Sequence, residues 1–223
     1  MSNIYSKNIF YLLLKFNYAE FLDAYNKNGE IEKSQERKSL LKEIKAYSEV
    51  NWDANLSVDV IHLILSDIQN QLYIVQRADK PENAFLFDKT AGWHISSWEN
   101  PDWTVIRELS EELDIDGILA ESPEEYEKLL SEVDLTKNAV IKKIRKDFWH
   151  KSIRKLPDNR QRIKRDNPTL YIGKYTGEVK YKDWEAQDLI KVTIDELQKL
   201  FTEYPEHFAD DLKEIITNNY NSF

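Results

Sequence analysis

The stretch of sequence that is most informative about the fold is Thr90-Ala-Gly-Trp-His-Ile-Ser-Ser-Trp-Glu-Asn-Pro-Asp-Trp-Thr-Val-Ile-Arg-Glu-Leu-Ser-Glu-Glu-Leu-Asp114. It contains Asn100-Pro101, a strong signal for the start of a helix, because asparagine caps backbone N–H groups and proline fits the first helical position. We therefore expect a helix over about residues 101–113. Its apolar residues fall on or near one stripe: Trp103, Ile106, Leu109 and Leu113.

Three glutamates share another face of this predicted helix, because Glu108, Glu111 and Glu112 stand at positions i, i+3 and i+4. Like charges at these spacings destabilise an isolated helix by a few tenths of a kcal/mol per pair. A divalent cation such as Mg²⁺, which binds carboxylate oxygens, gives such a cluster a use. Arg107 can hold a carboxylate in place, and Glu99 can reach back into the same site. Considered alone, a glutamate-rich face is more often simply solvated.

The stretch resembles the Nudix box, the pattern G-x5-E-x7-R-E-U-x-E-E-x-G-U in which U is a bulky aliphatic residue. Glu99 matches the first glutamate, Arg107-Glu108-Leu109-x-Glu111-Glu112 follows after seven residues, and Ile115 matches the last aliphatic position. The resemblance covers about residues 57–118 and 169–215. The preceding hairpin, Arg77, Lys80, Phe87-Asp88 and Gly92-x-His94 are similar to the isopentenyl-diphosphate-isomerase-like branch. The isomerase itself is excluded, because it requires a cysteine and this chain has none.

Three residues depart from the box. Trp93 stands at its opening glycine, Trp98 at a position where glycine commonly precedes the glutamate, and Asp114 at its closing glycine. Aspartate tolerates the left-handed conformation that follows a helix. Trp93 is the more serious change, because the backbone of that loop is expected to approach a metal ion. We expect Trp98 and Trp103 to pack in the core or in a loop.

The resemblance implies a metal-assisted attack of water on a phosphoanhydride, with Mg²⁺ or Mn²⁺ as cofactor. It implies metal ligands at Glu108, Glu111, Glu112 and Glu99, and catalytic roles for Glu111, Glu112 and Arg107. One carboxylate would serve as general base. Many family members carry a further acidic residue before a late strand, which here suggests Glu185, with Glu178 as the second choice.

We expect an α/β/α sandwich around a mixed sheet. Residues 1–55 are interpreted as an N-terminal helical extension with helices over 4–27 and 35–48, and residues 56–223 as the Nudix domain. Strands are predicted near Val58–Leu65 and Leu72–Val75, a helix from Pro123, a strand at Thr169–Tyr175, and a last helix near residues 209–218. Residues 120–166 are interpreted as an insertion.

Residues 137–165 within that insertion are strongly basic, whereas the chain as a whole has a net charge of −9. Phosphate binding, with Phe148 and Trp149 stacking on a base, is one interpretation. A solvated basic hairpin or helix pair is the other, and it is slightly favoured. The expected substrate-binding residues are Arg77, Lys80, His94, Arg160, Arg162 and Arg165. For His94, a structural role is at least as plausible.

The composition favours a globular protein in a reducing compartment, and we expect a cytoplasmic location with no membrane span. The acidic net charge makes nucleic acid an improbable partner. The leading function is hydrolysis of a nucleoside diphosphate derivative or a related organic pyrophosphate, by a protein that forms a dimer. The alternative is a Nudix-fold module that binds a nucleotide without turning it over, which the altered glycines favour. A role in RNA decapping or RNA binding would rest on the basic segment alone.

Overall fold

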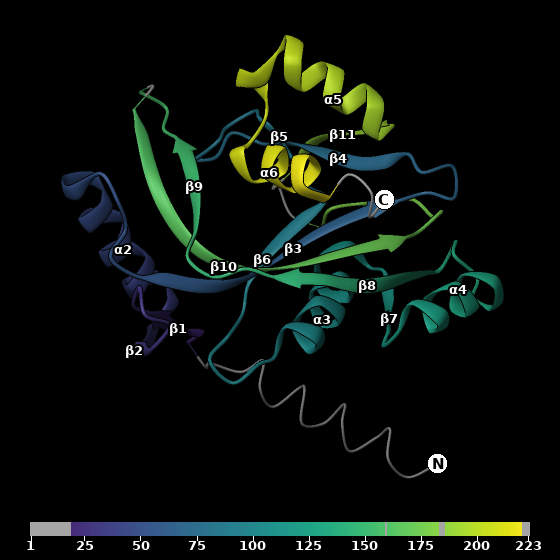
Figure 1. Ribbon diagram of the computed structural model, residues 1–223, viewed down its shortest axis with the longest axis horizontal. Coiled ribbons are helices and arrows are strands. Elements are labelled where there is room, and N and C mark those ends of the chain that lie inside the picture. The colour runs from purple at the N-terminus through teal and green to yellow at the C-terminus, as the bar shows by residue number, and fades with distance from the viewer. Residues whose placement is uncertain (1–18, 159, 183–185, 220–223) are drawn as a thin grey trace.

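The computed structural model describes residues 19–158, 160–182 and 186–219. In this part of the chain eleven strands form one mixed sheet (Figure 1). The strands are β1 (Phe21–Tyr25), β2 (Ile31–Glu36), β3 (Ser57–Ser66), β4 (Leu72–Arg77), β5 (Phe87–Asp88), β6 (Ala91–His94), β7 (Asp116–Ala120), β8 (Asn138–Lys146), β9 (His150–Lys155), β10 (Gln161–Lys174) and β11 (Ala186–Val192). The helices are α2 (Arg37–Asn51), α3 (Pro101–Leu113), α4 (Pro123–Glu132), α5 (Ile194–Glu203), the 3₁₀ turn η1 (Pro205–His207) and α6 (Asp210–Asn219). None of these helices has the length and apolar character needed to cross a membrane.

The centre of the sheet is the parallel pair β3 and β10, in register from Val58 and Asp166 to Ser66 and Lys174. Nearly every residue of β3 is buried, which explains why its sequence is an almost continuous apolar run. β10 has two different halves: its first residues pair with β9, and its later residues pair with β3 and β8. β10 thus carries the β9–β10 hairpin away from the body of the sheet (Figure 1).

β3 and β4 are joined by the predicted turn, but they pair only at Ser66 and Leu72. Beyond that point β3 pairs with β6, whereas β4 pairs with β5 and β11. The sheet is therefore split between the β3–β6 pair and the β4–β5 pair, and this split positions the site described below.

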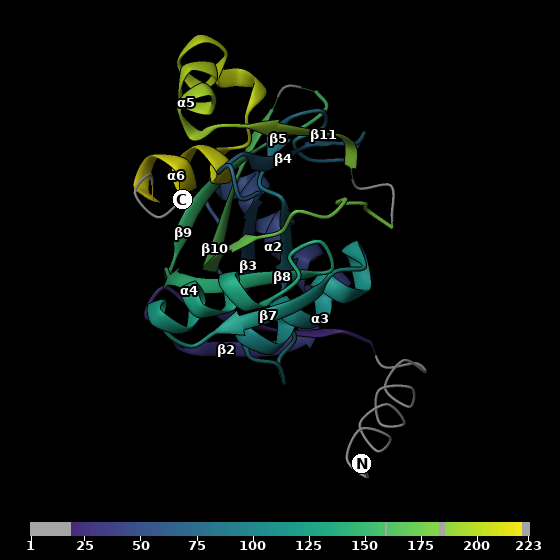
Figure 2. The same ribbon diagram turned by 90° about the vertical axis from the view of Figure 1, so that its right-hand side faces the viewer.

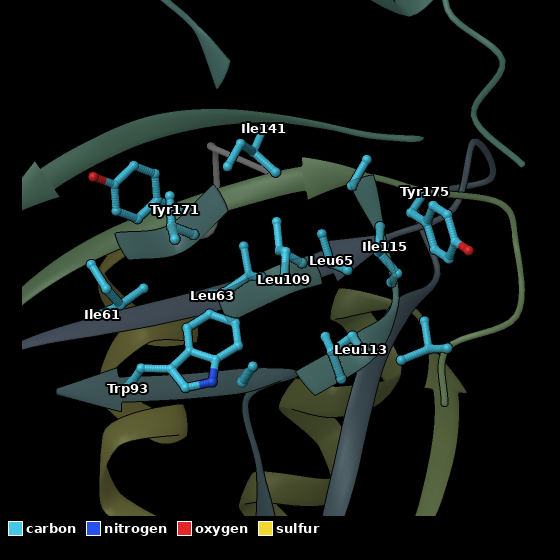
Figure 3. Packing of buried hydrophobic residues seen from close by; sticks show 14 of the residues in the cluster. Ile61, Leu63, Leu65, Trp93, Leu109, Leu113, Ile115, Ile141, Tyr171 and Tyr175 are labelled. Carbon is cyan, nitrogen blue, oxygen red and sulfur yellow. The ribbon is translucent and has the colours of Figure 1, made fainter. Parts of the chain in front are cut away.

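α3 covers one face of the sheet. Val105, Leu109 and Leu113 pack against Ile61 and Leu63 of β3 in the largest buried cluster, part of which is shown in Figure 3. The expected apolar stripe is correct at Leu109 and Leu113. Trp103 departs from it, because this side chain is 38% exposed.

The opposite face is covered by α5 and α6, which lie on the other side of the sheet from α3 in Figures 1 and 2. Leu197 of α5 and Leu212 of α6 pack with Ile64 and Ile74 from the sheet. α5 begins with a capping box in which Thr193 and Glu196 each satisfy a backbone N–H of the other. The α/β/α sandwich around a mixed sheet is confirmed.

The N-terminal region differs from the prediction. Residues 19–36 form the β1–β2 hairpin, and β1 joins the main sheet through Ala24 and Val58. The part of the predicted first helix that precedes residue 19 lies outside the described residues. The second predicted helix is confirmed as α2, which packs through Leu40 and Ile44 against Leu22. The burial of β1 alternates, with Leu22 and Ala24 buried between more exposed neighbours, but its sequence of mostly apolar residues does not show this period of two.

The stretch interpreted as an insertion is also different, because residues 120–166 supply strands of the main sheet. β8 lies between β7 and β10, and its buried residues include Ala139, Val140 and Ile141. The basic residues of β8 alternate with these apolar ones or follow them, so the stretch is a core element with a charged exposed side. A basic hairpin does exist, but it consists of β9 and the first half of β10.

Candidate functional site

Helix α3 begins and ends as the sequence predicts. The Asn100 side chain accepts a hydrogen bond from the backbone N–H of Trp103 at 2.8 Å, and Pro101 occupies the first turn. Asp114 ends the helix with φ 58°, the left-handed conformation that glycine adopts in the box. The departure at Asp114 therefore leaves the shape of this helix end intact.

The carboxylates of α3 are organised by Arg107. Its guanidinium donates to Glu99 and Glu111 at 2.9 Å each, and it lies 2.8 Å from Glu108. Glu99 is further held by the Thr104 hydroxyl at 2.7 Å. Burial opposes the charge on Arg107, but the surrounding carboxylates outweigh it and raise the pKa of Arg107. Burial also opposes the charge on Glu108. It therefore raises the pKa of this carboxyl, although the nearby Arg107 lowers it in part.

Trp93 contacts the last of the four box glutamates directly. β6 places the Trp93 side chain on the α3 face of the sheet, where it is 6% exposed and lies among apolar side chains, as Figure 3 shows. Its indole N–H donates to Glu112 at 2.5 Å. The tryptophan at the box's first glycine thus packs in the core and holds a carboxylate. Trp98, in contrast, is 59% exposed in the loop before α3, so of the two expected places for this side chain the structure excludes the core.

A cavity of about 250 Å³ lies in the split between β3 and β4. Ile61 and His62 line it from β3, Val75 and Arg77 line it from β4, and Glu112 reaches it from α3. The remaining charged residues of the lining are Arg37, Glu82, Asp88, Lys89, Arg154, Lys164 and Asp211. A box glutamate and a group of cations therefore face the same space.

A network of buried charges forms one wall of the cavity. Asp211 of α6 accepts hydrogen bonds from Arg154 of β9 at 2.9 Å and from Lys89 at 3.2 Å. Lys164 of β10 lies 2.9 Å from Asp166, which is also buried. Burial opposes ionisation of Asp211, but Arg154 and Lys89 outweigh it and hold the pKa of this carboxyl well below its usual range. The Asp211 carboxylate is thus ionised at neutral pH.

Two histidines line the cavity in their neutral forms. Burial lowers the pKa of His62 well below its usual value, and the nearby Lys89 adds to this effect. Burial also lowers the pKa of His94, and the neighbouring cations, led by Lys164 and Arg37, lower it further. The Nε2 atom of His94 is buried and has no hydrogen-bond partner within the described ranges. His94 lines the cavity, and its role in binding substrate stays a prediction.

Only some of the other predicted substrate-binding residues line the cavity. Arg77 lines the cavity, whereas Lys80 is not among the residues that line it. Arg160 is exposed and paired with Asp158 at 2.6 Å, and Arg165 pairs with Asp53 at 2.8 Å. Arg162 is buried against Glu82. Arg160 and Arg165 are held away from the cavity by these carboxylates, whereas Arg162 does not line the cavity but contacts Glu82, which does.

The two candidates for a further acidic residue are not brought to the site. Glu178 is exposed and pairs with Lys180 at 2.7 Å. Glu185 lies outside the described residues, so its role stays a prediction. The chain just before it does run beside the box helix, because the backbone N–H of Lys182 donates to the Glu112 carbonyl at 3.0 Å. Tyr181 also lines the cavity.

The sequence interpretation missed Lys164, Arg154 and Asp211. The sequence does contain a signal for Lys164, because alternate residues of a strand share a face. Arg162 and Lys164 therefore lie on the same face of the strand, whereas Arg165 lies on the other. The same period puts Arg154 on one face of β9, opposite Arg162 in the register. Asp211 carries no such signal, because its partners come from β9 and from the loop before β6.

The chemistry of the α3 side chains fits a divalent ion. Arg107 is one cation in contact with three carboxylates, and Glu112 lies on the same helix face, so negative charge is in excess there. The donors are all carboxylate oxygens, which Mg²⁺ and Mn²⁺ prefer. In the described part of the chain no three His, Asp or Glu side chains are already arranged around one point. Binding would therefore exchange contacts with Arg107 or Trp93 for contacts with the ion.

Comparisons with known proteins give matches in structure alone. No family model matches the sequence, and no curated protein matches it. The crystal structure of DR0079 from Deinococcus radiodurans is similar with a TM-score of 0.60 and 17% identity, covering 90% of this chain and 99% of that one. A bifunctional NMN adenylyltransferase/ADP ribose pyrophosphatase from Francisella tularensis has a TM-score of 0.45 and 15% identity, covering 84% of this chain and 47% of that one. A MutT protein from Methanosarcina mazei has a TM-score of 0.42 and 15% identity, covering 72% and 93%.

The likeness to DR0079 shows a shared fold. Because it leaves only a tenth of this chain uncovered, it extends beyond the segments that resemble the Nudix pattern. The mixed α/β architecture, with the box helix packed on the sheet, is consistent with the Nudix fold that the sequence predicted. The assignment to the isomerase-like branch stays a prediction.

Proposed function

We propose that this protein is a Nudix-type hydrolase that splits a phosphoanhydride bond in a nucleoside diphosphate derivative or a related organic pyrophosphate. The observation that carries the proposal is that Glu112 of the box helix faces the same cavity as Arg77, Arg154 and Lys164. A diphosphate needs cations around its oxygens and a carboxylate beside the phosphorus that is attacked. The cavity between β3 and β4 brings such cations and such a carboxylate to one space.

In this proposal Mg²⁺ or Mn²⁺ is held by Glu108, Glu111 and Glu112, with Glu99 and Arg107 bracing them. The ion neutralises phosphate charge and lowers the pKa of a bound water. Arg107 keeps the carboxylates of Glu99, Glu108 and Glu111 together through the contacts of 2.8–2.9 Å described above. These contacts reduce the electrostatic cost of gathering like charges before the ion arrives.

The cavity side chains bind and orient the diphosphate. Arg77 enters from β4 and is 31% exposed, with Asp88 3.4 Å away, so its guanidinium has room to take a phosphate oxygen. Arg154 and Lys164 contribute positive charge from the opposite wall while staying fixed by Asp211 and Asp166. The Trp93 N–H fixes the orientation of Glu112, and one of the carboxylates at the site accepts the proton of the attacking water.

One observation favours the second candidate, a module that binds a nucleotide without hydrolysing it. The 2.5 Å hydrogen bond from Trp93 engages a carboxylate oxygen that the catalytic function requires. If that bond persists when the ligand is bound, Glu112 cannot give this oxygen to an ion. The phosphate-binding wall would be unaffected, because its residues come from β9, β10 and α6.

The test is product release from nucleotide sugars, dinucleotides, nucleoside triphosphates and isoprenoid diphosphates with Mg²⁺ or Mn²⁺. Under the hydrolase proposal, wild type turns over at least one class, and Glu112→Gln loses about two orders of magnitude or more in kcat/KM. Glu127→Gln is the matched control, because Glu127 is an exposed residue of α4. Its rate should equal that of wild type.

A binding measurement separates the two candidates if nothing turns over. Calorimetric titration of the same compounds detects binding without hydrolysis, and binding that Glu112→Gln leaves unchanged supports the module. Absence of both turnover and binding across the panel contradicts both proposals.

A further inference from the structure

Arg37 is a further cation of the cavity between β3 and β4, besides Arg77, Arg154 and Lys164. It is the first residue of α2, and it lines the cavity together with residues of β3, β4 and β6. It lies outside the segments that resemble the Nudix pattern. The N-terminal region of the chain thus contributes a guanidinium to the space that the diphosphate is proposed to occupy.

The backbone of Arg37 is held in place from two sides. Its N–H donates to the Glu20 carbonyl at 2.7 Å, at the end of the β1–β2 pairing. The preceding residue, Glu36, caps α2 with its carboxylate. β1 is in turn tied to the loop between β6 and α3, because the Ser97 N–H donates to the Phe21 carbonyl at 2.9 Å. The hairpin and α2 therefore fix the position from which this side chain reaches the cavity.

The side chain of Arg37 forms an ion pair with Glu20 at the surface. One guanidinium nitrogen donates to the Glu20 carboxylate at 2.7 Å, and the two side chains are 44% and 34% exposed. Glu20 is not among the residues that line the cavity. An ion pair between exposed side chains is screened by water and contributes little to stability. The guanidinium can therefore change partners at little cost.

Three other cations of the cavity are paired with fully buried carboxylates. These pairs are Arg154 and Lys89 with Asp211, and Lys164 with Asp166. Breaking such a pair leaves a buried charge without its partner, which is strongly unfavourable. Arg37 can leave Glu20 without this penalty, because water solvates the carboxylate that is left. Compared with these three cations, Arg37 is the one suited to exchange its partner when an anion arrives.

We infer that the Glu20–Arg37 ion pair regulates ligand binding at the cavity. When an anionic ligand enters, Arg37 leaves Glu20 and donates to a phosphate oxygen, so Glu20 competes with the ligand for one guanidinium. A guanidinium binds phosphate through two parallel, charge-assisted hydrogen bonds, which are stronger than a screened surface pair. The inference rests on the proposed function for the position of the diphosphate. It adds a binding residue from the N-terminal region and a carboxylate that limits the affinity.

Replacing the two partners should have opposite effects. Arg37→Gln removes the cation and should weaken binding about tenfold, as expected for the loss of a hydrogen bond to a charged group. Glu20→Gln removes the competitor and should tighten binding by up to about fivefold, because the exposed pair is weak. In the Arg37→Gln background, Glu20→Gln should change nothing, since the guanidinium for which it competes is gone.

The test is calorimetric titration of the full chain, with Mg²⁺ present, by inorganic pyrophosphate and by α,β-methylene-ADP, whose P–C–P bridge is not hydrolysed. The control pair is Lys33 and Glu43, a surface ion pair between β2 and α2 that does not line the cavity. Lys33→Gln and Glu43→Gln should bind both ligands as wild type does. Circular dichroism checks the fold of each variant, and tighter binding by Glu20→Gln cannot arise from misfolding.

The inference is overturned if Arg37→Gln binds both ligands as tightly as wild type, if Glu20→Gln tightens binding equally with and without Arg37, or if wild type binds neither ligand. An effect of Arg37→Gln on the nucleotide analogue alone also overturns it, because the contact is then with the nucleoside and not with phosphate oxygens. Turnover without any effect of Arg37→Gln on binding contradicts this inference alone. The expected binding effects without turnover contradict the hydrolase proposal alone.

Discussion

The α3 carboxylates and the buried charges around Asp211 are two acidic centres that border one cavity and differ in how their charge is balanced. On α3 a single guanidinium contacts Glu99, Glu108 and Glu111, and burial raises the pKa of Glu108. Around Asp211, Arg154 and Lys89 outweigh burial, and the pKa of the carboxyl falls far below its usual value. The first centre has an excess of negative charge, whereas the second is neutralised by its own cations.

This difference in charge balance suggests that the two centres have different roles, one in binding and one in stabilising the fold. A group of carboxylates with too few cations gains from binding another cation. A buried network whose carboxylates are already paired fixes the positions of the strands that carry it, and its cations Arg154 and Lys164 still line the cavity. We therefore expect changes at the Asp211 network to affect stability most, and changes at α3 to affect ligand binding and catalysis most.

The largest expected effect is on stability at Asp211. Asp211→Asn keeps the shape of the side chain but leaves Arg154 and Lys89 without their buried counter-charge. We expect a loss of about 3–5 kcal/mol in the free energy of unfolding, measured by urea denaturation.

The control for this prediction is Asp158→Asn, which removes an exposed partner of Arg160. Its unfolding curve should match that of wild type, because exposed ion pairs contribute little. Equal curves for Asp211→Asn and wild type would show that the buried network does not stabilise the fold.

The next effect is a pH dependence at Glu82. Burial would raise the pKa of Glu82, but Lys45 and Arg162 outweigh it and lower the pKa from 4.5 to about 2. A lowered pKa stabilises the protein above pH 4.5, and this contribution is lost as the pH falls towards 2. The shift corresponds to about 3 kcal/mol.

Wild type and Glu82→Gln can be compared by urea denaturation between pH 7 and pH 3. Wild type should be more stable at pH 7, and the difference should shrink as the pH falls below 4.5. A difference that is constant with pH would mean that Glu82 contributes through packing rather than through its charge.

The smallest effect is expected at Trp93. Trp93→Phe keeps an aromatic ring in the core but removes the N–H that donates to Glu112. We expect a loss of about 1–3 kcal/mol in stability, the range for a hydrogen bond to a charged group. Trp103→Phe is the control at a partly exposed indole. If Trp93→Phe causes no further loss of stability in a Glu112→Leu background, the loss is assigned to this hydrogen bond. An unchanged loss in that background would assign it to packing.

Features encoded by neighbouring residues could be predicted from the sequence. Asn100-Pro101 fixed the start of α3, and the spacing of Glu108, Glu111 and Glu112 gave the shared carboxylate face, because a helix brings i, i+3 and i+4 together. The strands β3 and β4 and the turn between them were likewise visible in the apolar runs. All of these depend on residues close in the chain.

Features that depend on distant residues were missed. Asp211, Arg154 and Lys89 come from three separate elements, and only the folded sheet places them together. The basic residues of β8 suggested an insertion, because their number concealed the apolar residues between them. β1 falls within the first predicted helix, since its pairing with β3 is a long-range contact that local spacing does not reveal.

The pairing of β3 with β10 has a consequence for how the chain folds. Val58 and Asp166 are partners across 108 residues (166 − 58), so the central parallel pair closes a very long loop. Contacts of such sequence separation slow folding, because chain entropy is lost before they form. On the ribosome, β3 emerges long before β10 and must wait with one edge unpaired. We therefore expect the isolated N-terminal half to be prone to aggregation, and the order of synthesis to limit the rate at which this protein reaches its native state.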